Sequence, residues 1–119
     1  MWQVRVDYIK EWLDSLDGDT LAQVVAALEL LSEIGPVLGR PLVDTVKASR
    51  HANMKELRPG SAGRSEIRIL FAFDPVRRAV ILYGGDKSGN WKGWYKEAIP
   101  LADRLFDDYL AGLDREGDW

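Results

Sequence analysis

The 119-residue chain is predicted to fold as a single α+β domain. Three observations support this prediction. Apolar residues recur at helical spacing near both ends of the chain, alternating runs typical of strands occupy its middle, and the length suits one hydrophobic core but not two. We therefore expect one domain over residues 1–119, with an antiparallel or mixed sheet of about four strands, two N-terminal helices and a C-terminal helix.

The N-terminal third is predicted to begin with a short strand and to continue with two helices. Residues 2–6, WQVRV, alternate enough for a strand. Apolar residues at helical spacing follow in residues 7–16 and again in 19–35, with an Asp-Gly-Asp break between them. Asp19 is a candidate N-cap of the second helix, because its carboxylate can accept a hydrogen bond from the first helical turn.

The rest of the chain is predicted to form a loop, three strands and a closing helix. Residues 35–53 contain scattered Gly and Pro and are predicted to have little regular structure. Residues 54–58, 65–74 and 78–84 are strand-like runs separated by turn-forming residues, as in an antiparallel meander. Residues 94–113 carry apolar side chains at helical spacing, so this segment is predicted to be an amphipathic helix.

Composition excludes several classes of protein. The chain has no cysteine, which rules out disulfides and thiolate-bound metal, and His51 is its only histidine, so a two-histidine ribonuclease mechanism is excluded. We expect His51 to be a loop residue and expect no metal site and no cofactor. The first 16 residues are interrupted by charges, unlike a signal peptide or membrane span, and the expected location is the cytoplasm.

Charge is unevenly distributed along the chain. Between residues 47 and 96 there are eleven basic residues against four acidic ones, a net charge of +7, whereas the rest carries −10. A chain of this kind can concentrate positive potential on one face while its net charge is only −3. Such a face attracts phosphates, although a solvated charged surface with no ligand has the same composition.

Alternation along the strands indicates where the arginines lie. In 65–74 the odd-numbered residues from Ile67 to Phe73 are apolar and share one face, while Arg68 points to the other. The predicted hairpin gathers on that other face Glu56, Arg58, Arg64, Glu66 and Arg68. Guanidinium groups held on a sheet suit bidentate contact with phosphate oxygens. The alternative is a set of Arg–Glu pairs that only keep the sheet soluble.

A Gly-, Lys- and aromatic-rich segment, residues 83–98, follows the last predicted strand. Its order Asp-Lys-Ser is not the Gly-Lys-Ser/Thr of a phosphate-binding loop. Lysines interleaved with Trp and Tyr are typical of surfaces that stack on unpaired bases and neutralise phosphates. Trp94 has two open interpretations, base contact or packing of the last helix on the sheet, whereas Trp91 is expected in a loop and in contact with a ligand.

The order of these motifs resembles the HigB-like toxins of the RelE superfamily, the phage-related branch of type II toxin–antitoxin systems. The resemblance spans nearly the whole chain and is carried by the sequences LGRPLVDTVKASRHANMKELR, RILFAFDP, AVILYGGDKSGNW and YKEAIPLA. It implies a RelE-like α+β domain with a concave basic groove on its sheet. It also implies an mRNA endoribonuclease, an mRNA interferase, that usually acts on the ribosome. Because the chain has no cysteine, one histidine and no compact acidic cluster in its basic segment, we expect this cleavage to be metal-independent.

Carried over residue by residue, the resemblance places Arg58 and Arg68 on the groove wall and Lys87 at its mouth. In this interpretation the RNA 2′-hydroxyl attacks the adjacent phosphate while the arginines stabilise the developing charge. Tyr95 is a candidate acid, and Glu66 or Glu56 a candidate base, with the choice left open. Four further residues are assigned to substrate contact: Lys55, Arg64, Trp91 and Lys92.

The resemblance also implies partners. These are a HigA-like helix-turn-helix antitoxin and mRNA on the ribosome, with DNA reached only through the antitoxin complex and no membrane contact. The antitoxin is expected to neutralise the groove or to hold the last helix in an inactive position. Two alternatives remain at this point. One is a non-catalytic RNA- or protein-binding module on the same fold, and the other is a structural interaction protein.

Overall fold

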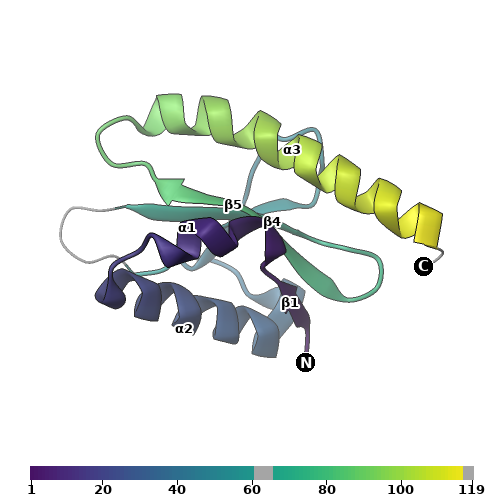
Figure 1. The fold of residues 1–119 in the computed structure, drawn as a ribbon, viewed down its shortest axis with the longest axis horizontal. Helices are drawn as coiled ribbons and strands as arrows, with labels where there is room; N and C mark the ends of the chain where they lie inside the picture. The colour runs from purple at the N-terminus through teal and green to yellow at the C-terminus, as the bar shows by residue number, and fades with distance from the viewer. Residues whose placement is uncertain (61–65, 117–119) are drawn as a thin grey trace.

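A five-stranded sheet forms the middle layer of the protein, as seen in a computed structural model that describes residues 1–60 and 66–116 (Figure 1). The strand order is β1-β5-β4-β3-β2, with β1 parallel to β5 and every other neighbouring pair antiparallel. The strands are β1 (Gln3–Arg5), β2 (Val43–Thr45), β3 (Met54–Leu57), β4 (Ile67–Phe73) and β5 (Arg78–Asp86).

Helices cover both faces of this sheet, with α1 and α2 on one side and α3 on the other (Figure 1). The helical elements are η1 (Asp7–Ile9), α1 (Lys10–Asp14), α2 (Gly18–Ile34), η2 (Gly35–Val37) and α3 (Trp91–Glu116). The α+β prediction is therefore confirmed, including the two N-terminal helices and the C-terminal helix. The fifth strand, β2, lies in the segment that was predicted to be a loop.

Two hydrophobic cores lie on the two faces of the sheet. Ile67, Ile69 and Phe71 of β4 pack with α2 in one core, which confirms the predicted alternation. Leu70 and Ala72 of the same strand pack with α3 in the other core. A strand that is buried on both faces has apolar residues at consecutive positions. Because β4 is such a strand, the charged face that alternation predicted is found only near the strand ends.

The ends of two helices differ from their predicted positions. Asp17, rather than Asp19, is the N-cap of α2, because its carboxylate accepts a 2.8 Å hydrogen bond from the backbone N–H of Thr20. Helix α3 begins at Trp91, three residues earlier than predicted, so Trp91 lies in the first helical turn and not in a loop. Gly35 ends α2 with φ of 72°, a conformation that favours glycine.

Helix α2 with the turn that follows it is unusually apolar. Among the described residues, Gly18–Val37 is the one stretch long and apolar enough to span a membrane by length and composition, with a mean hydropathy of 1.3. A core helix passes the same test. Val24 and Leu31 on its inner side are fully buried against the sheet, so packing within the domain accounts for that side of the helix.

Candidate functional site

A buried carboxylate stands at the centre of the charged cluster on the α3 side of the sheet. Glu56 on β3 is only 4% exposed. It accepts a hydrogen bond of 3.0 Å from Arg58 Nε and one from the Tyr95 hydroxyl, and Arg68 Nε lies 3.9 Å from its Oε1 atom. A carboxylate can be buried in this way because cations and hydrogen-bond donors compensate for the lost water.

Strand alternation and sheet register bring these groups together. Met54 and Glu56 point toward α3, whereas Leu57 points into the core beneath α2. Glu56 is opposite Leu70 in the register, so Arg68, two residues before Leu70, lies diagonally across the hairpin on the same face. The cluster therefore follows from the period of two along β3 and β4.

Glycine at position 85 allows α3 to deliver Tyr95 to this cluster. A Cβ atom on Gly85 would lie 2.4 Å from Trp94 Nε1, closer than side chains approach one another. Trp94 packs against Tyr83 and meets Tyr95 edge-on, with ring centroids 5.0 Å apart. Trp94 thus holds the start of α3 on the sheet, and Tyr95 next to it reaches Glu56.

Burial and the neighbouring carboxylate both act on the Tyr95 hydroxyl. Loss of water and the hydrogen bond to Glu56 raise the pKa of Tyr95 from 10.0 to about 12. The phenol is protonated at neutral pH, as in any tyrosine, and the raised pKa means that Glu56 and burial hold its proton more tightly. Lys87 Nζ lies 5.6 Å from the centre of the Tyr95 ring and 5.9 Å from that of Trp91.

A second group of ion pairs lies beside the cluster, on its β2 side. Asp44 is opposite Glu56 in the register of β2 and β3. Its carboxylate lies 3.3 Å from Arg58 Nη2 and 3.2 Å from Arg40 Nη2. A hydrogen bond from the Thr45 backbone N–H, together with the two arginines, lowers the pKa of Asp44. Arg58 is therefore held between two carboxylates.

The outer rim of the site is aromatic and basic. Trp91 is 54% exposed at the start of α3. Lys87 and Lys92 both lie within 6 Å of the centre of its ring, at 5.9 and 5.6 Å. An exposed indole with two ammonium groups nearby has the chemistry to stack on a base and to neutralise adjoining phosphates.

The structure brings together most of the predicted site residues. Arg58, Arg68 and Tyr95 all converge on Glu56, and Lys87 joins them through the Tyr95 ring. Of the two predicted base candidates, Glu56 lies in the cluster, whereas Glu66 is exposed and bonds through its backbone to Asp86 and Lys87.

Of the predicted substrate contacts that the structure describes, Lys55 is not part of this arrangement. The Lys55 side chain donates to Thr45 Oγ1 and lines the hollow between residues 36 and 45 on the α2 side of the sheet, so strand alternation carries it away from Arg58. Arg64 lies outside the described residues. The basic residues of segment 47–96 do not all gather at one site. Arg50 pairs with Asp107 and Arg78 pairs with Asp74, both away from Glu56.

Sequence reasoning missed Arg40 and Asp44. Both precede β3 in the segment that was predicted to be a loop, so no register connected them to Glu56. The signal available was the short run Leu42-Val43-Asp44-Thr45-Val46, which contains three β-branched residues and of which β2 takes three residues. The central role of Glu56 was also predictable. It shares a face of the hairpin with Arg58 and Arg68, and a carboxylate in such a position is expected to form ion pairs with its arginine neighbours.

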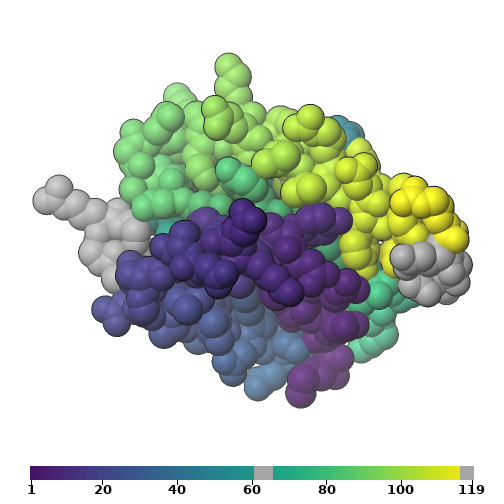
Figure 2. Space-filling view, viewed as in Figure 1, coloured from purple at the N-terminus to yellow at the C-terminus, as the bar shows by residue number. Residues whose placement is uncertain are grey.

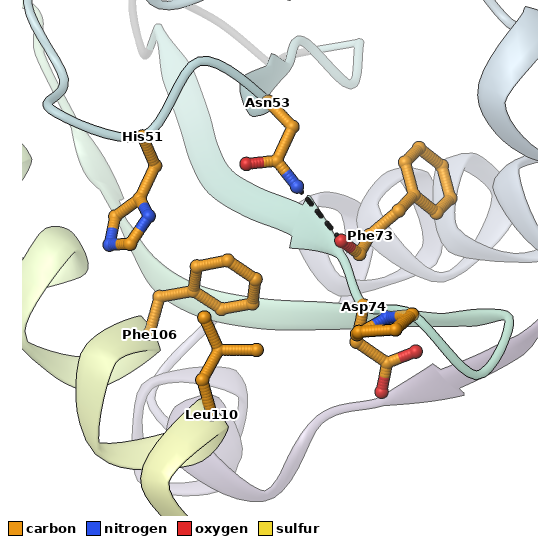
Figure 3. Close-up of a pocket in the computed structure, with 7 residues that line it drawn as sticks. His51, Asn53, Phe73, Asp74, Phe106 and Leu110 are labelled. Carbon is orange, nitrogen blue, oxygen red and sulfur yellow. Dashed lines mark hydrogen bonds between the residues drawn. The ribbon is translucent and has the colours of Figure 1, made fainter. Parts of the chain in front are cut away.

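A separate hollow of about 350 Å³ lies at the other end of β4, between the loop before β3 and α3 (Figure 3). Its floor is apolar, with Phe73, Phe106 and Leu110. His51 at its edge is a loop residue, as predicted, and its Nε2 atom lies 2.7 Å from Asp107. In the described residues no group of three or more His, Asp or Glu side chains could hold a metal ion, either here or at Glu56.

Comparison with known proteins places this chain among phage-related proteins. Residues 11–107 match the family described as phage derived protein Gp49-like (DUF891). The chain is 58% identical over 113 residues to a candidate toxin of Mycobacterium tuberculosis named HigB2, an alignment that covers 95% of this chain and 56% of that protein. It is 54% identical over 108 residues to a second candidate toxin of that organism, HigB3, covering 91% and 92% of the two chains. The chain thus spans about half the length of HigB2 and most of HigB3.

Proposed function

We propose that this chain, which belongs to the Gp49-like family, is the toxin of a type II toxin–antitoxin system and cleaves mRNA. Its two HigB-named relatives support the toxin assignment. The proposed activity is that of a metal-independent endoribonuclease that acts on mRNA in the ribosome. Its partners are a HigA-like helix-turn-helix antitoxin and translated mRNA in the cytoplasm, and it reaches DNA only through the antitoxin.

The observation that carries this proposal is the convergence of Arg58 and Arg68 on Glu56 beside Tyr95. Two guanidinium groups and a protonated phenol around a carboxylate supply every group that transesterification of RNA requires. The 2′-oxygen forms a bond to phosphorus, the bond from phosphorus to the 5′-oxygen breaks, and negative charge builds on the other phosphate oxygens. Fixed guanidinium groups stabilise that charge more than they stabilise the starting phosphate.

Proton transfers in this mechanism fall to Glu56 and Tyr95. Glu56 takes the proton of the 2′-hydroxyl, and its place between the arginines favours it over the exposed Glu66. Tyr95, whose phenol is protonated at neutral pH as in any tyrosine, gives a proton to the departing 5′-oxygen. Lys87, next to the Tyr95 ring, neutralises the phosphate at the leaving side.

The outer residues have binding roles in this proposal. Trp91 stacks on an unpaired base, and Lys87 and Lys92 near its ring neutralise neighbouring phosphates. The ribosome holds the mRNA strand in place. Binding by the chain alone is weak, because its net charge is −3 and the described arginines at Glu56 are paired with carboxylates.

One observation favours the alternative of a non-catalytic RNA- or protein-binding module. Arg58 already contacts both Glu56 and Asp44, so part of the positive charge of the site is neutralised within the protein. A cluster of this kind also stabilises the junction of β2, β3 and α3 without any chemistry. The experiment below separates the two functions.

Inducible expression with mapping of mRNA 5′ ends tests the proposed function. Expression of the wild-type chain is expected to arrest growth and to create new 5′ ends within translated messages. Arg68→Ala is expected to lose both effects while the protein stays folded, as judged by circular dichroism. Growth arrest without new 5′ ends would favour the binding module, and a folded wild-type chain with neither effect would contradict the toxin assignment. A helix-turn-helix protein encoded beside this chain would support the assignment independently.

A further inference from the structure

The carboxylate of Asp44 lies beside the Glu56 cluster, but the proposed mechanism uses neither of its oxygens. Asp44 on β2 is directly opposite Glu56 on β3. Its neighbour Val43 packs in the core beneath α2, and Val46 packs in the core beneath α3. By alternation the Asp44 side chain therefore lies on the α3 side of the sheet with Glu56, where it contacts Arg58.

Arg58 depends on such contacts for its direction, because it lies outside the strand. It follows directly after β3 and precedes Pro59. Its backbone N–H donates a 2.8 Å hydrogen bond to the carbonyl oxygen of Leu42, which continues the pairing of the two chain segments beyond β3. The Arg58 side chain is 34% exposed, compared with 17% for Arg68 inside β4. A long exposed side chain takes one direction only where contacts offset its loss of rotamer freedom.

Two carboxylates hold the Arg58 guanidinium by one edge. Nε donates to Glu56 Oε2 at 3.0 Å, and Nη2 donates to Asp44 Oδ2 at 3.3 Å. A guanidinium has five N–H groups in a planar fork. Within residues 1–60 and 66–116, the Nη1 atom of Arg58 forms no hydrogen bond or ion pair. The edge formed by Nη1 and the second hydrogen of Nη2 can therefore bind two oxygens of one phosphate.

The Asp44 carboxylate is itself held on β2. Its Oδ1 atom accepts a 2.9 Å hydrogen bond from the Thr45 backbone N–H. Its Oδ2 atom also accepts one of 3.2 Å from Arg40 Nε, but the Arg40 side chain is 78% exposed, and exposed ion pairs contribute little. Strand pairing and the Thr45 bond thus fix Asp44, and Asp44 in turn orients Arg58. The same negative charge repels a phosphate that approaches Arg58.

We propose that Asp44 is a positioning residue for RNA cleavage, which directs the open edge of Arg58 toward the reacting phosphate at some loss of RNA affinity. This inference rests on the proposed function, because it takes Arg58 to stabilise the transition state. Correct orientation accelerates the reaction of bound substrate, whereas a nearby carboxylate weakens the binding of any phosphate. Removal of the charge at Asp44 should therefore slow cleavage and strengthen RNA binding. A merely structural role would weaken both.

Asp44→Asn tests this role in the full chain. The amide keeps an oxygen for the Thr45 N–H, so β2 should stay paired, and the negative charge is removed. Asp14→Asn is the matched control, because it makes the same change of net charge at an exposed position of α1. Helix α1 lies with α2 on the side of the sheet opposite α3 and the Glu56 cluster (Figures 1 and 2).

Two quantities are measured for each variant. The single-turnover rate is measured on translating ribosomes at saturating protein. Affinity is measured by fluorescence anisotropy with a labelled single-stranded RNA that carries 2′-deoxyribose at the mapped cut site. We expect Asp44→Asn to cleave at least about tenfold more slowly and to bind this RNA about threefold more tightly at low salt. Asp14→Asn should match the wild type in both. Asp44→Glu keeps the charge but displaces the carboxylate by one methylene group, so it should bind RNA normally and cleave slowly.

A double-mutant cycle tests whether Asp44 acts through Arg58. Addition of Asp44→Asn to Arg58→Ala should not lower the remaining rate further, because the group that Asp44 orients is then absent. Arg40→Ala, which removes the other arginine at Asp44, should lower the rate by no more than about threefold. Circular dichroism checks that each variant is folded.

Other results would overturn the proposal in distinct ways. Wild-type rates in both Asp44 variants would show that Asp44 has no part in the reaction while leaving the toxin assignment intact. Equal losses from Asp44→Asn with and without Arg58 would show that Asp44 acts through another group. A joint fall in rate and RNA affinity would reduce Asp44 to a structural role. A wild-type chain that does not cleave mRNA would contradict the proposed function itself and, with it, the role of Asp44.

Discussion

Tyr95 at the start of α3 donates its hydroxyl hydrogen to the carboxylate of Glu56 on β3, across 39 positions of sequence. The same carboxylate accepts a hydrogen bond from Arg58 and faces Arg68. One acid thus connects the last helix to both arginines of the hairpin. In the proposed reaction the proton acceptor, the proton donor and the charge-stabilising groups are already in contact before RNA binds.

The Tyr95–Glu56 contact predicts an unusual tyrosine titration. Tyr95 should titrate near pH 12, and Glu56→Gln should lower its pKa toward 10.0 because the negative charge that opposes ionisation is removed. Since folding raises this pKa, the resulting contribution to stability is present below about pH 10 and declines as the pH rises toward 12. Carbon-13 NMR of the four tyrosines measures this, with Tyr95→Phe for assignment. A Tyr95 pKa near 10 in the wild type would contradict the contact.

Loss of either strand arginine should abolish most of the activity. Arg58→Ala or Arg68→Ala is expected to remove on the order of 3 kcal/mol of transition-state stabilisation, a 100-fold or greater fall in single-turnover rate. Arg68→Lys should not restore the full rate, since an ammonium group cannot reproduce the planar guanidinium fork. Arg104→Ala, at an exposed position of α3, is the control and should cleave normally. Equal rates for Arg68→Ala and Arg104→Ala would remove Arg68 from the site.

Asp74 should make folding stability depend on acidic pH. Its carboxylate is completely buried and accepts hydrogen bonds from Tyr109, from Arg78 and from the backbone of Val76. Although burial opposes ionisation, these bonds lower its pKa below 3.8. The stability contributed by the ionised form is therefore present above pH 3.8 and is lost as the pH falls below it.

Substitution of Asp74 tests this role through urea unfolding at several pH values. Asp74→Ala should lower the free energy of unfolding by about 2–4 kcal/mol at neutral pH, because it leaves buried donors without an acceptor. In addition, the free energy of unfolding of Asp74→Ala should fall less at acidic pH than that of the wild type. Asp108→Asn at an exposed position of α3 is the control. An Asp74→Ala protein as stable as this control would show that the buried hydrogen bonds contribute little.

Binding of RNA without the ribosome should be weak and dependent on salt. Each phosphate neutralised by Lys or Arg releases counterions, so affinity should fall steeply between about 50 and 200 mM salt. Lys87→Ala should weaken binding and reduce the slope of log affinity against log salt by about 1. Fluorescence anisotropy with a labelled single-stranded RNA measures both effects. An affinity unchanged by salt over this range would exclude a site built from lysine and arginine.

The fold could be predicted from sequence wherever periodicity was regular. The alternation from Ile67 to Phe73 and the helical spacing in residues 19–35 gave the correct elements and faces. Strand β2 was missed because it has only three residues, Val43–Thr45, and is recognisable mainly through its pairing with β3. The start of α3 at Trp91 was missed because aromatic and glycine residues have weak helix propensity, which packing of Trp94 on the sheet overrides.

The candidate site was predictable to the extent that it follows strand alternation. Arg58, directly after β3, and Arg68, in β4, both continue the even-numbered alternation of their strands, and both reach Glu56. The contact of Tyr95 with Glu56 depends on how α3 crosses the sheet, which no local pattern encodes. Lys55, by contrast, is next to Glu56 in β3, so strand alternation by itself places it on the opposite face. The choice between Glu56 and Glu66 therefore required three-dimensional information.

The chemical ends of the RNA fragments test the central claim most directly. Purified wild-type protein is added to translating ribosomes in parallel reactions, one of which uses a message with 2′-deoxyribose at a mapped cut site. We expect fragments ending in a 2′,3′-cyclic phosphate or 3′-phosphate, with 5′-hydroxyl partners and no cleavage at the deoxy position. Fragments with 5′-phosphate ends, or cleavage at the deoxy position, would contradict a mechanism that uses the RNA 2′-hydroxyl with Glu56, Tyr95 and the two arginines.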